Sequence, residues 1–188
     1  MKSVKSKFEV QSVGFIMFCF AAGAIFGSLV GAFSLTEDIP AIVSGYTLKT
    51  MPGGVYAFLN GSKFHIFALI CATSTLGVAT IPALVAVRGY LLSCTAAAIY
   101  VGYPGGKGLL INAVVIGLPA LITLPCLIIM ASDSLTQSRK LLSLSLGNPP
   151  DTSRSVPIIS RSMVGLFFIA IAALAEEMLM PMLIANIF

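Results

Sequence analysis

The chain has 188 residues, of which 57% are hydrophobic and 10% are charged. A soluble domain of this size carries about 25% charged residues, because it must cover a water-facing surface. The composition therefore excludes an ordinary soluble enzyme or regulator, and lipid must solvate most of the chain. Basic residues exceed acidic ones by 11 to 7. They fall in the gaps between apolar runs, where they set membrane orientation, so we expect no nucleic-acid partner.

A short basic segment opens the chain and leads into an uncharged run over residues 13–33. As a helix this run would rise roughly 30 Å, which matches the hydrocarbon thickness of a bilayer. A secretory signal peptide is the alternative, but its apolar part is shorter, about 7–15 residues, and ends at a small-residue cleavage site. No such site is clear here, so we expect a retained transmembrane helix.

Three glycines, Gly23, Gly27 and Gly31, repeat at intervals of four along this first span. On a helix they share one face, and small residues at that spacing let a second helix approach closely in lipid. We expect the partner helix to be internal. The alternatives are a helix of a second copy of the chain, which would give a homo-oligomer, or a helix of another protein.

Residues 34–63 form the first polar stretch and are expected outside the cell. Turn-forming Pro52-Gly53-Gly54 and Asn60-Gly61 divide the stretch. The apolar residues between these turns are spaced for one or two short amphipathic helices, at the membrane surface or against a partner.

The next apolar run, residues 64–103, carries one formal charge, Arg88. A single helix of this length would be about twice the bilayer thickness, so the chain must fold back. We predict a hairpin at Arg88-Gly89, with spans over 64–87 and 89–103 and a kink at Pro82. The second arm is short, and a re-entrant segment is the alternative. Arg88 is expected to snorkel at a helix end, or else to bind an anionic headgroup or substrate.

A turn over residues 103–108 precedes the fourth predicted span, residues 109–132. This span contains Asn112 and two prolines, Pro119 and Pro125, which are expected to kink it. A polar loop over 133–161, with a helical stretch near 135–146, is expected in the cytoplasm. The last span covers residues 162–186. We therefore predict an all-α fold: one polytopic membrane domain, residues 1–188, with about five spans.

Charge counting fixes the predicted orientation. With the amino terminus inside, the inner segments carry eight of the eleven basic residues: Lys2, Lys5, Lys7, Arg88, Arg139, Lys140, Arg154 and Arg161. The outer segments carry the other three, Lys49, Lys63 and Lys107. A four-span chain with 89–103 re-entrant would reverse this balance, against the positive-inside tendency. We therefore expect a multi-pass cell-membrane protein whose amino terminus is inside and whose carboxyl terminus is outside.

Two adjacent acids, Glu176 and Glu177, lie within the last predicted span. An ionised carboxylate at that depth costs about 2.5–3.5 kcal/mol even on the lenient insertion scale for Asp, so such residues are rare and usually paired. Three hypotheses remain open. In the first, the two glutamates form a proton or cation site. In the second, they form a bridge between helices. In the third, they have no such role and either lie near the inner interface or are protonated. For the bridge, the candidate partners are Thr73, Thr75, Thr80, Arg88 and Asn112.

Enzymatic chemistry has no visible basis in the sequence. The four cysteines, Cys19, Cys71, Cys94 and Cys126, lie inside apolar runs and are expected to pack as small hydrophobes. His65 is the single histidine, without the second ligand that a zinc site would need. No nucleophile–base set or phosphate-binding loop is present. We expect no metal, no cofactor and no catalytic residue.

Taken in order, several short motifs resemble the stage II sporulation protein M family. They are Gly23-Ala24-Ile25-Phe26-Gly27, Leu76-Gly77, Pro82, Arg88-Gly89, Gly106-Lys107-Gly108-Leu109-Leu110, Leu118-Pro119, Leu124-Pro125 and Ala172-Ala173-Leu174-Ala175-Glu176. The resemblance covers most of the chain. Members of the family follow the first Leu-Pro with Gln-Asn, whereas Ala120-Leu121 stands here, so the role of that amide pair is not carried over.

The resemblance implies a non-enzymatic scaffold in the mother-cell membrane. Such a protein localises peptidoglycan-degrading partners at the septum while the forespore is engulfed. The alternative hypothesis is a small transporter or channel, in which the Glu176/Glu177 pair, the proline-broken fourth span and Thr73-Ser74-Thr75 line a path.

Overall fold

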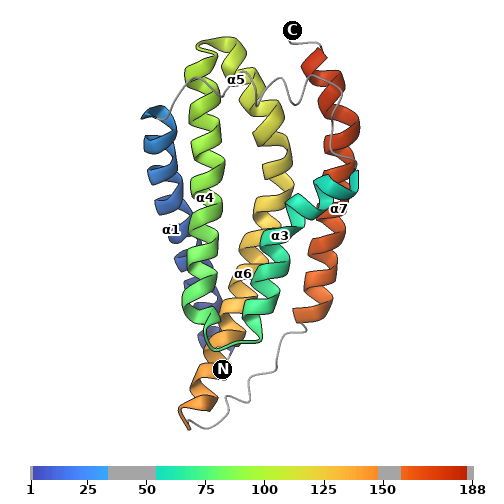
Figure 1. The fold of residues 1–188 in the computed structure, drawn as a ribbon. Helices are drawn as coiled ribbons and strands as arrows, with labels where there is room; N and C mark the ends of the chain where they lie inside the picture. The colour runs from blue at the N-terminus through green and yellow to red at the C-terminus, as the bar shows by residue number, and fades with distance from the viewer. Residues whose placement is uncertain (1, 34–53, 148–157, 186–188) are drawn as a thin grey trace.

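The computed structural model describes residues 2–33, 54–147 and 158–185 (Figure 1). Every regular element in these ranges is a helix, which confirms the predicted all-α class. The elements are α1 (Lys2–Phe33), α3 (Gly54–Ala72), α4 (Gly77–Gly102), α5 (Gly106–Asn112), the π-helix η1 (Ala113–Gly117), α6 (Leu118–Ser145) and α7 (Ile158–Ala185). Elements α5, η1 and α6 form one continuous helix over residues 106–145.

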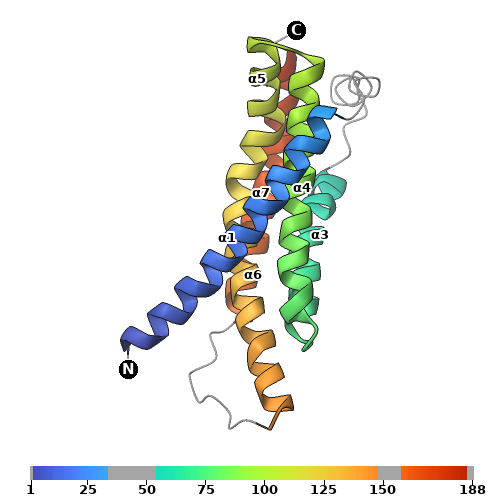
Figure 2. The same cartoon turned by 90° about the vertical axis from the view of Figure 1, so that its left-hand side faces the viewer.

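These helices stand side by side and alternate in direction (Figure 1). The start of α1, the turn between α3 and α4, and the far end of α6 lie at one end of the bundle. The turn between α4 and α5 lies at the other end, together with the end of α7. The first turns of α1 lean away from the remaining helices (Figure 2).

Among the described residues, three helices are long and apolar enough to cross a membrane: Gln11–Phe33, Gly77–Gly102 and Gly106–Ser145. Two shorter apolar helices are Ser62–Ala72 and Ser162–Leu174. Large apolar side chains on their outer faces are exposed, among them Phe18, Phe33 and Leu121 at 71%, 88% and 76%. A soluble monomer rarely exposes extended apolar surface, so this arrangement fits a bundle surrounded by lipid.

The predicted hairpin at Arg88-Gly89 is wrong, because α4 runs through both residues without a break. The chain turns back earlier, between Ala72 and Gly77. There the Thr73 hydroxyl donates to the Ile70 carbonyl at 2.8 Å, and the Leu76 amide donates to the Ser74 hydroxyl at 3.2 Å. Short polar side chains that bond nearby backbone compete with helix continuation. The predicted spans 64–87 and 89–103 are therefore replaced by α3 and the 26-residue α4, and α4 leaves no short arm at 89–103 to re-enter.

Other boundaries also move. Helix α3 begins at Gly54, so the last part of the predicted outer segment 34–63 is the start of a helix that enters the bundle. Residues 34–53 lie outside the described ranges. Helix α6 continues to Ser145, so the helix predicted near 135–146 extends the fourth span without a break. The predicted turn after Tyr103 is confirmed, and Gly105 adopts a φ of 93° there, which favours glycine.

The glycine row of α1 packs directly against the backbone of α4. A methyl group added at Gly23, Gly27 or Gly31 would overlap the carbonyl oxygens of α4, contributed in turn by Ala86, Tyr90 and Cys94. The separation along the chain is the same in all three pairs, so α1 and α4 run parallel and in register. The expected internal partner of the glycine row is therefore confirmed as α4.

The seam between α1 and α4 is reciprocal. Gly89 on α4 lies against the Phe20 carbonyl of α1, and the Ser93 hydroxyl donates to the Ala24 carbonyl at 2.7 Å. Helix α6 packs on the pair through a core of fully buried side chains: Ile16, Ile81, Val85, Ala131 and Leu135. Two helices joined backbone to backbone thus provide the base on which α6 rests.

We predict that Gly27→Ala destabilises the bundle by about 1–3 kcal/mol, since its methyl group has no space against α4. Gly14→Ala is the matched control. It lies on the same helix with nothing within 4 Å of the added carbon, and alanine favours the helix by up to about 1 kcal/mol. Denaturant titration of the helical signal in detergent measures both. Equal stability of the two variants would contradict the packed seam.

Candidate functional site

Two basic side chains, the half-buried Arg88 of α4 and the exposed Lys63 of α3, approach one aromatic ring. The Arg88 guanidinium carbon lies 5.0 Å from the centroid of the Phe64 ring, and the Lys63 ammonium lies 5.4 Å from it. A cation over an aromatic face is stabilised by about 0.5–1 kcal/mol when exposed and by about 2 kcal/mol when desolvated. The ring thus partly offsets the cost of holding the half-buried Arg88 among apolar helices.

Arg88 does not lie at a helix end, as predicted, but in the middle of α4. It is eleven residues from Gly77, about 16 Å along the helix axis. Lys63 was expected outside the spans, yet it lies within α3. The sequence did not reveal this pair because Lys63 and Arg88 are 25 positions apart and each stood next to a glycine or turn signal.

His65 follows Phe64 on α3 and is buried, with 2% of its surface exposed. Its Nε2 lies 3.3 Å from the Thr123 carbonyl oxygen of α6. A carbonyl only accepts, so the ring N–H donates and ties α3 to α6. The Thr123 hydroxyl in turn donates to the Pro119 carbonyl at 3.0 Å. The segment Ser62–His65 therefore brings polar groups of α3 against the proline-containing part of α6.

Asn112 lies where the long helix changes its winding. Its amide nitrogen donates to the Ala96 carbonyl of α4 at 2.8 Å, while its Oδ1 is buried and accepts no hydrogen bond. The π-helix η1 follows at once, and Pro119 is the second residue of α6, which comes next. A single π turn inside an α-helix is frequent at functional positions. The two other predicted kink residues, Pro82 and Pro125, lie inside α4 and α6.

Glu176 and Glu177 belong to α7, but their side chains lie outside the described part of the structure. Three of the bridge partners considered for the glutamates lie in or close to the turn between α3 and α4. Thr73 and Thr75 belong to the turn between α3 and α4, and Thr80 donates to the Leu76 carbonyl at 3.2 Å within α4. Arg88 lies on α4 and Asn112 on α5, whereas among the described residues α7 packs mainly against α3, α6 and η1.

The four cysteines are partly buried and form no disulfide. Within the described ranges, no three His, Cys, Asp or Glu side chains gather as metal ligands. Comparison of the chain with protein-family models, with curated proteins and with solved structures finds no match.

We predict that Phe64→Leu lowers the free energy of unfolding by about 1–3 kcal/mol, because it removes the ring face that Lys63 and Arg88 share. Phe67→Leu is the control on the same helix. Phe67 is 51% exposed, and a surface change of this kind usually alters stability by within about 0.5 kcal/mol. Thermal unfolding in detergent compares them. A larger effect at Phe67 would show that the ring contact is unimportant.

Proposed function

We propose that the chain is a non-enzymatic membrane scaffold with five crossings, its amino terminus in the cytosol and its carboxyl terminus outside. The charge distribution along the alternating helices supports this orientation. The start of α1, which carries Lys2, Lys5 and Lys7, lies at the same end of the bundle as Arg139 and Lys140 (Figure 1). Lys107 lies at the opposite end. Basic residues concentrate on the cytosolic side of membrane proteins.

The observation that carries the scaffold proposal is the use of interior polar groups as ties between helices. Ser93 bonds α4 to α1, Asn112 bonds α5 to α4, and His65 bonds α3 to α6. Ser138 of α6 donates to the Cys71 carbonyl of α3 at 3.1 Å. Each tie ends on a backbone carbonyl of the neighbouring helix. Such bonds stabilise one arrangement of helices, which suits a docking platform better than a moving transporter.

The resemblance to stage II sporulation protein M supplies the partners. In this proposal the chain sits in the mother-cell membrane and localises peptidoglycan-degrading proteins at the septum during forespore engulfment. The glutamates of α7 then serve the bundle structurally.

A tagged chain expressed in sporulating cells is expected to recover a peptidoglycan hydrolase after mild detergent extraction and crosslinking. An unrelated tagged multi-pass protein is the control for non-specific capture. Mass spectrometry of the captured proteins is the measurement. Capture of no cell-wall enzyme above the control would refute the scaffold proposal in this form.

A small transporter is the second candidate, and the half-buried Arg88 favours it. Lys63, Arg88 and the π turn before Pro119 lie between the helix ends, where polar groups are usually functional in membrane proteins.

Purified chain in liposomes separates the two candidates. The scaffold proposal predicts no proton or cation flux above that of empty liposomes, and no change with Glu176→Gln and Glu177→Gln combined. Flux that this double variant abolishes would establish transport. A pH-sensitive dye inside the vesicles provides the readout.

A further inference from the structure

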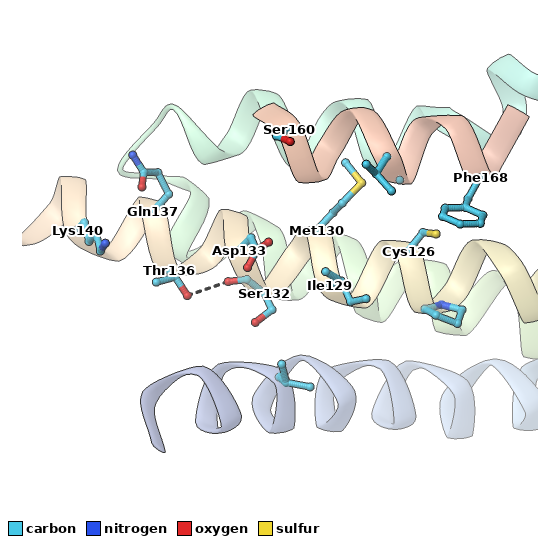
Figure 3. Close-up of a pocket in the computed structure, with 14 residues that line it drawn as sticks. Cys126, Ile129, Met130, Ser132, Asp133, Thr136, Gln137, Lys140, Ser160 and Phe168 are labelled. Atoms are coloured by element: carbon cyan, nitrogen blue, oxygen red, sulfur yellow. Dashed lines mark hydrogen bonds between the residues drawn. The ribbon is translucent and has the colours of Figure 1, made fainter. Parts of the chain in front are cut away.

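A groove runs along α6 between α1 and α7 (Figure 3). Its volume is about 600 Å³, within the range of roughly 300–1,000 Å³ typical of small-molecule sites. Val13 contributes from α1, and Val164 and Phe168 contribute from α7. Ile129, Val164 and Phe168 are 52%, 54% and 48% exposed, so the groove is open at the side of the bundle where lipid would lie.

The lining changes from polar to apolar along the groove. Thr136, Gln137 and Lys140 lie at one end, and Cys126 and Phe168 lie at the other (Figure 3). The polar end is level with the turn between α3 and α4, because Ser138 bonds to Cys71 there. In the proposed orientation this is the inner membrane interface. An occupant of the groove therefore needs a polar head at the interface and an apolar body pointing into the bilayer.

The volume of the groove indicates whether a lipid chain or a helix can occupy it. Lys140 and Pro125 are fifteen residues apart on α6, so the groove is about 22 Å long. A helix is about 10–12 Å across and would fill on the order of 1,700–2,500 Å³ over that length. Carbon chains pack at about 4 Å, so a single acyl chain is several-fold thinner than a helix. The whole empty space of the groove, with its open side included, is about 1490 Å³, which is less than a helix of that length occupies and enough for an acyl chain.

The charge at the polar end selects the headgroup. Lys140 lines the groove, Arg139 is exposed beside it, and Asp133 is the one acid among the lining residues. On the flanking helix α1, Lys2, Lys5, Lys7 and Glu9 precede Val13, but these first turns lean away from the groove (Figure 2), so Lys140 and Arg139 provide its basic end. Basic residues near the membrane surface attract anionic lipid in preference to neutral lipid.

We propose that this groove binds an anionic phospholipid of the inner leaflet. One acyl chain packs against Ile129, Val164 and Phe168, and the phosphate lies at Lys140. The inference requires that the bundle sits in a bilayer, but it does not depend on the scaffold function or on any protein partner.

The test uses the full chain reconstituted with phosphatidylglycerol that carries a photoactivatable acyl chain. Crosslinked peptides from α6 and α7 are expected around Ile129 and Val164. Val164→Trp fills the groove and is expected to lower crosslinking at least fivefold. Met163→Trp is the matched control, since Met163 is exposed on the same helix and does not line the groove. Both variants are compared at equal helical content and equal melting temperature.

The headgroup is tested in the same vesicles by competition with phosphatidylglycerol or phosphatidylethanolamine. Lys140→Ala is expected to reduce the preference for the anionic lipid about fivefold, which corresponds to about 1 kcal/mol for one basic residue. Lys107→Ala, an exposed lysine of α5 at the opposite end of the bundle, is its control. Equal crosslinking in the two tryptophan variants, crosslinks confined to other helices, or a second copy of the chain in place of lipid would overturn the proposal. An unchanged preference in Lys140→Ala would overturn the headgroup assignment.

Discussion

The close approach of α1 to α4 is the contact on which the rest of the bundle depends. Lipid tails are as apolar as leucine, so burial of leucine against leucine gives helices little reason to associate in a bilayer. Gly23, Gly27 and Gly31 instead bring the backbones of α1 and α4 into van der Waals contact. Many weak dispersion attractions then add up along the contact. The parallel pair then presents Ile16, Ile81 and Val85 as one surface for α6.

The same contact explains why the chain does not turn at Gly89. This glycine lies against the Phe20 carbonyl, so its missing side chain serves helix packing and not a turn. Arg88 is carried into the bundle as a consequence. A charge is costly there, and the Arg88 guanidinium lies near the Phe64 ring, which Lys63 also approaches. A packing requirement of the α1–α4 pair thus determines where Arg88 lies.

Apolar run lengths were enough to predict the helical class, the first span and the fourth span, because an uninterrupted run of about 20 residues has few alternatives. The position of the turn within residues 64–103 was not predictable from run length. Arg88-Gly89 and Thr73-Ser74-Thr75 both interrupt that run, and glycine signals a turn or a close contact equally well. The polar triplet was the better signal, since three hydroxyl residues in succession compete with the helix backbone.

The interior site was predicted only in part. Arg88 and Asn112 were identified as polar groups among apolar neighbours, but Lys63 and His65 were assigned to a segment boundary. Their places depend on α3 starting at Gly54, ten residues before the apolar run begins. A helix start in a stretch with glycines and mixed polarity has no strong local signal. Contacts such as His65 with Thr123 depend on how α3 packs against α6, which periodicity does not encode.

Cysteine accessibility in intact cells tests the central claim, a bundle threaded through the membrane with its basic end inside. The four native cysteines are replaced, and single cysteines are placed at exposed Gly106 and Ser145. A membrane-impermeant maleimide is expected to label Gly106→Cys directly and Ser145→Cys only after the membrane is permeabilised. Labelling of Ser145→Cys from outside, or equal labelling of both positions in intact cells, would contradict the account.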